Sequence, residues 1–82
     1  MDNEIIKAKV KELLLMYSKN KKIIENNTDL LKEHILDSIS FIQMVSQLEN
    51  QFKIEYDIFE LEIENFKNIN TITKNIEEKI KK

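Results

Sequence analysis

Residues 37–52 read DSISFIQMVSQLENQF, and their apolar side chains recur with the period of an α-helix. The predicted apolar stripe is Phe41, Val45, Leu48 and Phe52, widened by Ile42. Asp37 and Ser38 precede this stripe, and short polar side chains at such positions cap free backbone N–H groups. We therefore expect a helix that begins at Asp37–Ser38 and ends near Phe52.

Helical patterns also lie on both sides of this segment. A first helix is predicted over about residues 3–18, with Asp2 or Asn3 as its N-cap. Its apolar stripe is Ile6, Val10, Leu13 and Tyr17. A last helix is predicted from Asn70 as N-cap to about Lys81. Its stripe is Ile72, Ile76 and Ile80. One helical turn is expected around Glu64–Phe66.

Residues 19–37 form a long connection between the first two helices. Connections longer than roughly 12–15 residues are usually functional or held in place by apolar contacts of their own. The side chains expected to hold this one are Ile23, Leu30, Leu31, Ile35 and Leu36. We predict that the connection packs against the core and is not a linker.

The chain contains neither glycine nor proline among its 82 residues. Tight hairpin turns are hard to build without them, which disfavours a β-sandwich or barrel. Asn and Asp tolerate left-handed turns next best, and loops that contain them suit a helical protein. We therefore predict an all-α fold in one domain, residues 1–82, and the ends of the sequence favour a free-standing protein.

The composition excludes several classes of protein. The absence of cysteine excludes a disulfide scaffold, a thiolate zinc site and a cysteine nucleophile. Small secreted domains usually need disulfides, so a cytoplasmic location is expected. No apolar run approaches the roughly 18–20 residues of a membrane span, and the charged N-terminus is unlike a signal peptide.

The charges are unevenly distributed around a net charge of −2. Residues 26–64 hold two Lys, Lys32 and Lys53, against nine acidic residues. The weakly acidic total argues against a nucleic-acid-binding protein, and the acidic middle suggests a surface for basic partners.

Few groups in the sequence offer catalytic or metal-binding chemistry. His34 is the only histidine, so it either approaches Ser38 or is a solvated loop residue. A glycine-rich phosphate loop is excluded by the composition. The clustered carboxylates lack the spacing of an EF-hand and are interpreted as a solvated acidic segment: Glu55, Asp57, Glu60, Glu62 and Glu64. We expect neither an enzyme nor a metal site.

A series of short motifs surrounds Ser38. Residues 36–39 read LDSI, with apolar residues on both sides of Asp37-Ser38. The helix that follows carries Ile42, Val45, Leu48, Glu49 and Phe52, and then come Ile54, Tyr56 and the stretch ENFKNINTI (residues 64–72). In this order, residues 30–72 resemble the acyl and peptidyl carrier protein family. The resemblance implies a four-helix bundle of three longer helices and one short helix with a long first loop.

This resemblance also implies a prosthetic group, a 4′-phosphopantetheine arm attached to Ser38 by a phosphopantetheinyl transferase. Such an arm carries acyl intermediates as thioesters to partner enzymes of fatty acid, polyketide or other specialised biosynthesis. The implied partners are this transferase, acyl- or aminoacyl-activating ligases and acyl-transferring enzymes, and the implied state is a monomer. A phosphate on Ser38 would lie at a helix N-terminus, which favours an anion. Asp37 either contacts magnesium during the transfer or caps the helix.

Two positions depart from the family pattern, because many relatives have glycine in place of His34 and proline in place of Asp57. The residues expected to contact partner enzymes are Ile39, Gln43, Met44, Ser46 and Gln47. Glu49 is the only acid between residues 39 and 53. This pattern resembles D-alanyl or pathway-specific carriers more than the carriers of fatty acid synthesis. An aminoacyl, D-alanyl or peptidyl cargo stays open as an alternative. So does a small helical interaction protein without a prosthetic group.

Overall fold

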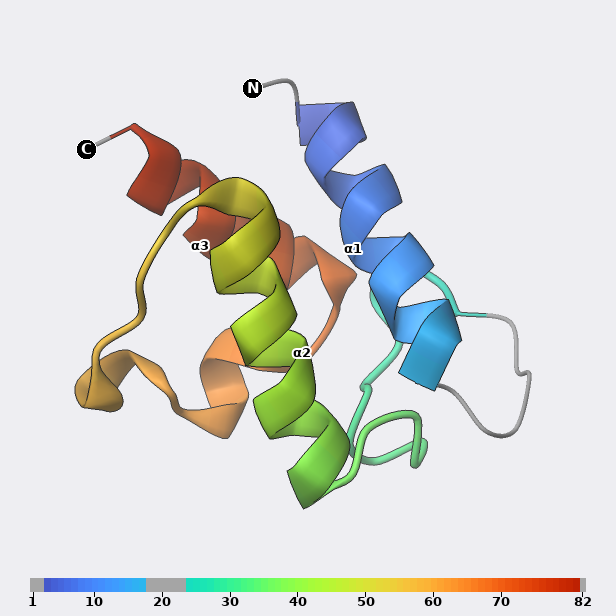
Figure 1. Ribbon diagram of the computed structural model, residues 1–82. Helices are drawn as coiled ribbons and strands as arrows, with labels where there is room; N and C mark the ends of the chain where they lie inside the picture. Colours follow the sequence, from blue (N-terminus) through green and yellow to red (C-terminus); the bar gives the residue numbers. More distant parts are fainter. Residues whose placement is uncertain (1–2, 18–23, 82) are drawn as a thin grey trace.

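The computed structural model describes residues 3–17 and 24–81, and in this part of the chain all regular structure is helical. Three α-helices follow one another as α1 (Asn3–Tyr17), α2 (Ser38–Phe52) and α3 (Ile69–Ile80). Two short 3₁₀ helices, η1 (Ile58–Glu60) and η2 (Ile63–Phe66), lie between α2 and α3 (Figure 1). The all-α prediction is confirmed. The expected turn around Glu64–Phe66 corresponds to η2, whereas η1 was not predicted.

Helix α1 packs against both α2 and α3 through the predicted stripe. Ile6, Val10 and Leu13 are buried, and Tyr17 is partly buried against the same core. Asn3 was expected as an N-cap, but it is the first helical residue, and its side-chain amide donates a hydrogen bond to Glu77 Oε1 of α3. Asp2, the alternative cap, lies outside the described residues. The two helices are therefore tied where α1 begins and α3 ends, at the upper edge of Figure 1.

Helix α2 has the predicted bounds, but its buried face is rotated from the predicted stripe. Val45, Leu48 and Phe52 are buried as expected, whereas Phe41 is only partly buried and Ile42 is 68% exposed. Met44 and Ser40 are buried in their place. Ile42 and Leu61 line the same two open apolar cavities, so the segment after α2 leaves Ile42 uncovered. The prediction of Ile42 as a core residue was therefore wrong.

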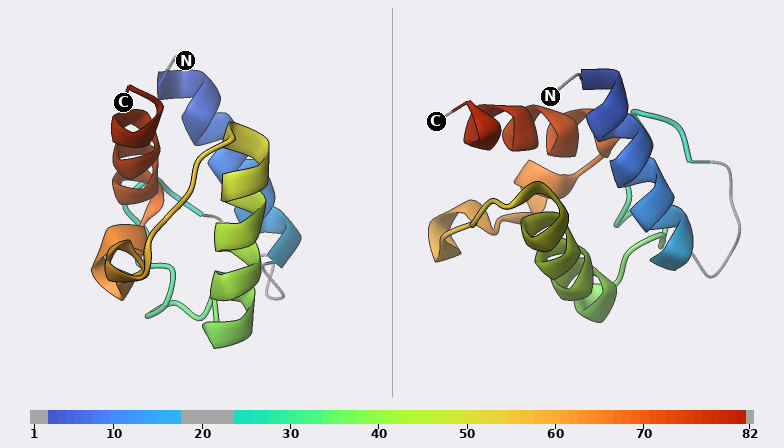
Figure 2. Two further views of the ribbon diagram at one scale, coloured as in Figure 1. Left: turned by 60° about the vertical axis from the view of Figure 1, so that its left-hand side comes forward. Right: turned by 45° about the horizontal axis from the view of Figure 1, so that its top comes forward.

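The long connection before α2 is held in place as predicted. Leu30, Ile35 and Leu36 are buried and Leu31 packs against them, whereas Ile23 lies outside the described residues. Two backbone hydrogen bonds fix the connection to the start of α3, from Leu30 N to Lys67 O at 2.9 Å and from Asn70 N to Asn26 O at 3.1 Å. This connection, drawn in cyan-green in Figures 1 and 2, delivers the chain to the start of α2.

An aromatic cluster fixes the segment between α2 and α3. Phe66 of η2 is fully buried, with its ring centroid 5.1 Å from that of Phe41 and 5.3 Å from that of Tyr56, both in edge-to-face geometry. The Tyr56 hydroxyl donates to Asn75 Oδ1 of α3 at 2.6 Å. Burial, reinforced by the nearby carboxylate charges of Glu60 and Glu49, raises the pKa of Tyr56. The phenol therefore stays protonated and keeps this hydrogen bond across the neutral range.

Helix α3 begins earlier than predicted. Asn68, and not Asn70, is its N-cap, and the Asn68 side chain accepts a 2.8 Å hydrogen bond from Thr71 N. Ile69 is therefore the first helical residue and is buried beside Ile72 and Ile76. Asn68 and Asn70 are two positions apart, so the sequence alone allows either one as the N-cap. The burial of Ile69 favours Asn68, because it makes Ile69 part of the helix. Within the described residues, no helix is long and apolar enough to cross a membrane.

The buried hydroxyl of Thr73 in α3 allows a test of this core. Thr73 Oγ1 has no hydrogen-bond partner among the described residues, and the side chain is 1% exposed. An unsatisfied buried polar group costs about 1–3 kcal/mol. We expect Thr73→Val to raise the free energy of unfolding by about 1 kcal/mol, measured by urea denaturation.

The matched control is Thr71→Val, because the Thr71 hydroxyl donates to Asn68 Oδ1 at 2.9 Å. This variant should lower the free energy of unfolding by about 0.5–1.5 kcal/mol. An equal loss in both variants would show that the Thr73 hydroxyl has a partner in solution.

Candidate functional site

Ser38 occupies the first position of α2, where its side chain is exposed to solvent. Asp37 is the N-cap in extended conformation, and its Oδ1 accepts a 2.7 Å hydrogen bond from Ser40 N. The Asp37 carbonyl accepts the bond from Phe41 N at 2.8 Å, which closes the first helical turn. Of the two roles considered for Asp37, the capping role is therefore observed. The Ser38 hydroxyl lies at the positive end of a 15-residue helix, where an attached anion is stabilised.

The connection reaches Ser38 through a left-handed residue, His34. Its φ angle is 59°, and its backbone N–H donates to Leu31 O at 3.1 Å. Ile35 N and Leu36 N then both donate to Leu30 O, at 2.9 and 3.0 Å. A left-handed turn is the conformation that glycine adopts without a steric cost, which explains why the family pattern has glycine at the position of His34. The His34 side chain is exposed, and the structure shows no hydrogen bond between it and Ser38.

An apolar cavity of about 230 Å³ opens beside Ser38. Its walls come from the connection, α2 and the segment around η1 and η2, and its lining residues are Leu31, Ser38, Phe41, Ile42, Leu61 and Ile63. A second cavity of about 220 Å³ shares Phe41, Ile42 and Leu61 with the first and extends along α2 towards Glu49. These two adjoining cavities, which share Phe41, Ile42 and Leu61, are called the apolar trough below, and Ser38 lines only the first of them.

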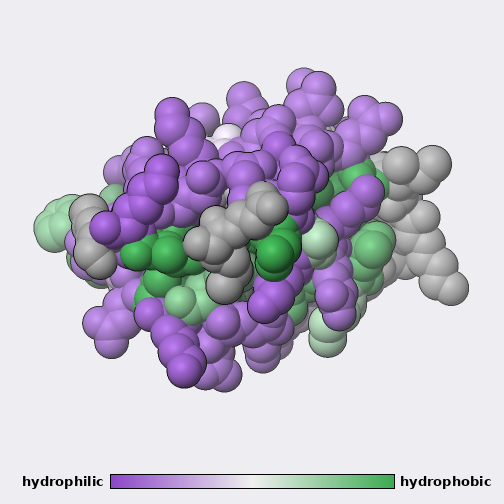
Figure 3. Space-filling model, turned by 90° about the horizontal axis from the view of Figure 1, so that it is seen from above, coloured by the Kyte–Doolittle hydropathy of each residue, from purple (hydrophilic) through white to green (hydrophobic). Residues whose placement is uncertain are grey.

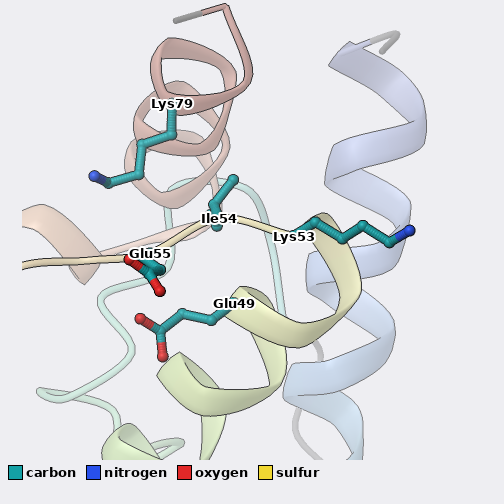
Figure 4. A pocket seen from close by; sticks show the side chains of 5 residues that line it. All are labelled: Glu49, Lys53, Ile54, Glu55 and Lys79. Atoms are coloured by element: carbon teal, nitrogen blue, oxygen red, sulfur yellow. The ribbon is translucent and has the colours of Figure 1, made fainter.

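A larger hollow lies at the other end of α2 and has a different character (Figure 4). It is lined by Glu49, Lys53, Ile54, Glu55 and Lys79. Figure 4 shows Lys53 pointing away from the hollow, while the carboxylates of Glu49 and Glu55 approach one another. Glu49 Oε2 accepts the backbone N–H of Tyr56 at 2.9 Å, so this acid fixes the chain after α2. The hollow is open, and two of its charged groups have structural roles, because Glu49 holds Tyr56 N and Lys79 pairs with Glu60.

The residues expected to contact partners are only partly at the surface. Ile39, Gln43, Ser46 and Gln47 are exposed on α2, with Ile39 70% exposed. Met44 is fully buried, because it lies on the same helical face as Ser40 and Leu48, which point into the core. The prediction of Met44 as a docking residue was therefore wrong.

Leu61 and Ile63 belong to the trough beside Ser38, although the sequence analysis did not single them out. The carboxylates beside them in ELEIE, residues 60–64, were interpreted as part of a solvated acidic segment. The available signal was that Leu61 and Ile63 are large apolar residues in this otherwise acidic stretch, which runs from the end of η1 into the start of η2. Within the described residues no three His, Asp or Glu side chains are grouped as metal ligands.

The sequence matches the family model described as "Phosphopantetheine attachment site" over residues 4–76. This range covers nearly the whole chain and includes the connection, α2 and most of α3. No curated protein matches the chain. Proteins of the matched family carry covalently attached 4′-phosphopantetheine, and such carrier domains are generally not catalytic.

The cap at the start of α2 is open to a direct test. Asp37→Ala removes the acceptor of the Ser40 N–H bond and should lower the free energy of unfolding by about 0.5–2 kcal/mol. Asp37→Asn keeps an acceptor oxygen, and asparagine is as good an N-cap as aspartate, so it should change stability by only a few tenths of a kcal/mol. Thermal or urea unfolding of both variants measures the difference. Equal stability of the wild type and Asp37→Ala would contradict the contribution of this bond.

Proposed function

The chain belongs to the phosphopantetheine attachment site family, and from this we propose that it is an acyl carrier protein whose prosthetic group is attached to Ser38. The observation that carries the proposal is the exposed hydroxyl of Ser38 at the N-terminus of α2, beside the apolar trough. Three features support the proposal: the exposed hydroxyl of Ser38, a helix end that favours a phosphate, and the adjacent apolar trough. We propose that the protein is not itself an enzyme.

The residues around Ser38 fit a phosphopantetheine group. In the proposed transfer, Ser38 Oγ would lose its proton and bond to the phosphorus next to the pantetheine of coenzyme A. At the same time the pyrophosphate P–O bond to adenosine 3′,5′-bisphosphate would break, and that nucleotide would leave. The added phosphate would lie at the first turn of α2, where backbone N–H groups lack intrahelical partners. When attached, the arm supplies a terminal thiol that holds the cargo as a thioester. The protein anchors this arm and presents it.

A tethered cargo explains how a small non-catalytic domain serves a pathway. A flexible tether gives its end a local concentration of roughly millimolar at a docked enzyme. Each complex must also be weak enough to dissociate, which small and partly polar contact surfaces permit. The proposed partners are the phosphopantetheinyl transferase, an activating ligase and acyl-transferring enzymes. We further propose a cytoplasmic, monomeric, single-domain carrier, in keeping with its cysteine-free composition.

The exposed face of α2 is the proposed contact surface for acyl-transferring enzymes. It consists of Ile39, Gln43, Ser46 and Gln47. Its amide and hydroxyl groups would form hydrogen bonds around the exposed Ile39 side chain. Asp37 is proposed to contact magnesium during the transfer while it caps the helix. A transfer rate and magnesium dependence unchanged in Asp37→Asn, which preserves the cap, would refute the metal contact.

Attachment at Ser38 is tested by intact-mass measurement. Apo protein is incubated with coenzyme A, magnesium and a broad-specificity phosphopantetheinyl transferase. The wild type is expected to gain one phosphopantetheine adduct and Ser38→Ala none, because alanine has no nucleophilic oxygen. Ser46→Ala, which removes an exposed hydroxyl elsewhere on α2, should be modified like the wild type. An adduct on Ser38→Ala, or none on the wild type, would exclude the proposed attachment site.

The apolar trough favours an acyl cargo over an aminoacyl one. Its walls around Phe41, Ile42 and Leu61 are largely hydrocarbon, and each methylene group that they bury is worth about 0.8 kcal/mol. We expect an octanoyl group on the arm to raise the melting temperature of the holo protein, and an alanyl group to leave it nearly unchanged.

The variant Ile42→Asn should remove most of this octanoyl stabilisation, since Ile42 lines the trough but is 68% exposed and contributes little to the core. Ile39→Asn is the matched control, because Ile39 is 70% exposed and does not line the trough. A larger stabilisation by the alanyl group than by the octanoyl group would favour the aminoacyl alternative.

A further inference from the structure

Large apolar side chains are crowded on the surface of residues 58–63. Their exposed fractions are 79% for Ile58, 84% for Phe59, 40% for Leu61 and 60% for Ile63. Single exposed apolar residues are ordinary, but four within six positions are typical of an interaction site. Helix η1 protrudes at the left edge of Figure 1 and of the right-hand view of Figure 2, apart from the three α-helices. Apolar atoms appear at the same edge in Figure 3.

Polar contacts hold these side chains outward. Asp57 Oδ1 accepts hydrogen bonds from Phe59 N at 2.9 Å and Glu60 N at 3.1 Å, and Asp57 N donates back to Glu60 Oε1 at 3.0 Å. Glu60 Oε1 also pairs with Lys79 Nζ of α3 at 2.7 Å. The hydrogen bond from Asp57 N and the Lys79 ammonium lower the pKa of Glu60, so these contacts persist to a lower pH than they would with an unperturbed glutamate. The exposed apolar residues are thus preorganised, which lowers the entropy cost of binding.

Carboxylates border the apolar side chains. Glu55, Asp57, Glu62 and Glu64 are exposed, and among the described residues Glu60 is the only acid of this segment in an ion pair. Such a surface complements an apolar hollow bordered by Lys or Arg. It disfavours contact with the same surface of a second copy, or with an anionic membrane, because both would bring negative charges together.

We propose that residues 57–64, the acidic-apolar patch, dock the transferase that modifies Ser38, by inserting Phe59 and Ile58 into an apolar hollow bordered by basic residues. This proposal rests on the proposed function. Leu61 and Ile63 of the patch line the same cavity as Ser38, so an enzyme that reaches Ser38 meets this end of the patch. An ordinary interface of roughly 800 Å² per partner is wide enough to extend to Ile58 and Phe59. An exposed aromatic side chain suits the anchor of such an interface. The outer face of α2 is nearly uncharged, so the patch supplies most of the electrostatic attraction.

The test is the steady-state kinetics of phosphopantetheine transfer from coenzyme A to the apo protein by a broad-specificity transferase. Phe59→Ser should raise the KM for the apo protein about tenfold, which is the effect of removing an anchor side chain from an interface. The kcat should stay unchanged, because the variant leaves Ser38 in place. Met16→Ser on α1 is the matched control, since Met16 is 73% exposed, and its KM should stay at the wild-type value. The double variant Glu62→Gln with Glu64→Gln should raise KM and make it depend less on salt concentration. The control double variant, Glu12→Gln with Glu25→Gln, should leave KM and its salt dependence as in the wild type.

Several results would overturn the proposal. They are an unchanged KM in Phe59→Ser, an equal rise in Met16→Ser, or a fall in kcat without a change in KM. Phe59→Ser could also leave KM unchanged but abolish a dimer that sedimentation detects in the wild type, which would assign the patch to a second copy of the chain. If it instead abolished binding to phosphatidylglycerol vesicles, with KM unchanged, the patch would be assigned to a membrane. A wild-type protein that is never modified would refute the proposed function itself. Normal modification of Phe59→Ser would refute only the docking role.

Discussion

The burial of Phe66 holds together the parts of the structure on which the site depends. This one ring packs edge-to-face against Phe41 of α2 and against Tyr56 of the segment that follows it. Such aromatic pairs contribute about 0.5–1.5 kcal/mol each beyond the area that they bury. Because Phe41 also lines the trough, the same contact that closes the core sets the distance between α2 and residues 61–63. The width of the trough beside Ser38 is therefore a property of the core.

The chain has no glycine, so other residues adopt the left-handed backbone conformation or cap the starts of the helices. His34 and Lys53 both adopt positive φ, and the Lys53 N–H closes the end of α2 on Glu49 O. Asp37, Asp57 and Asn68 each accept hydrogen bonds at the start of a helix. At these three helix starts, side-chain hydrogen bonds fix the direction of the chain, whereas the turns at His34 and Lys53 are closed by backbone hydrogen bonds.

Most of the fold was predictable from the sequence because helices repeat their apolar side chains regularly. The bounds of α2 and the buried stripe of α1 follow from this period together with caps such as Asp37. The face of α2 was misjudged, since Met44 and Ile42 are both apolar and only the packing of the neighbouring elements shows which is buried. Ser38 could be singled out from the ordered motifs of residues 30–72, but the trough could not be predicted. Its far wall comes from Leu61 and Ile63, more than twenty positions along the chain.

The lack of proline has a consequence for how the protein is formed. Uncatalysed isomerisation of peptide bonds before proline takes tens of seconds and often limits the refolding of small domains. Here every peptide bond of the unfolded chain is almost entirely in the isomer that the folded state requires. A newly synthesised or transiently unfolded molecule can therefore return to its native structure without this delay.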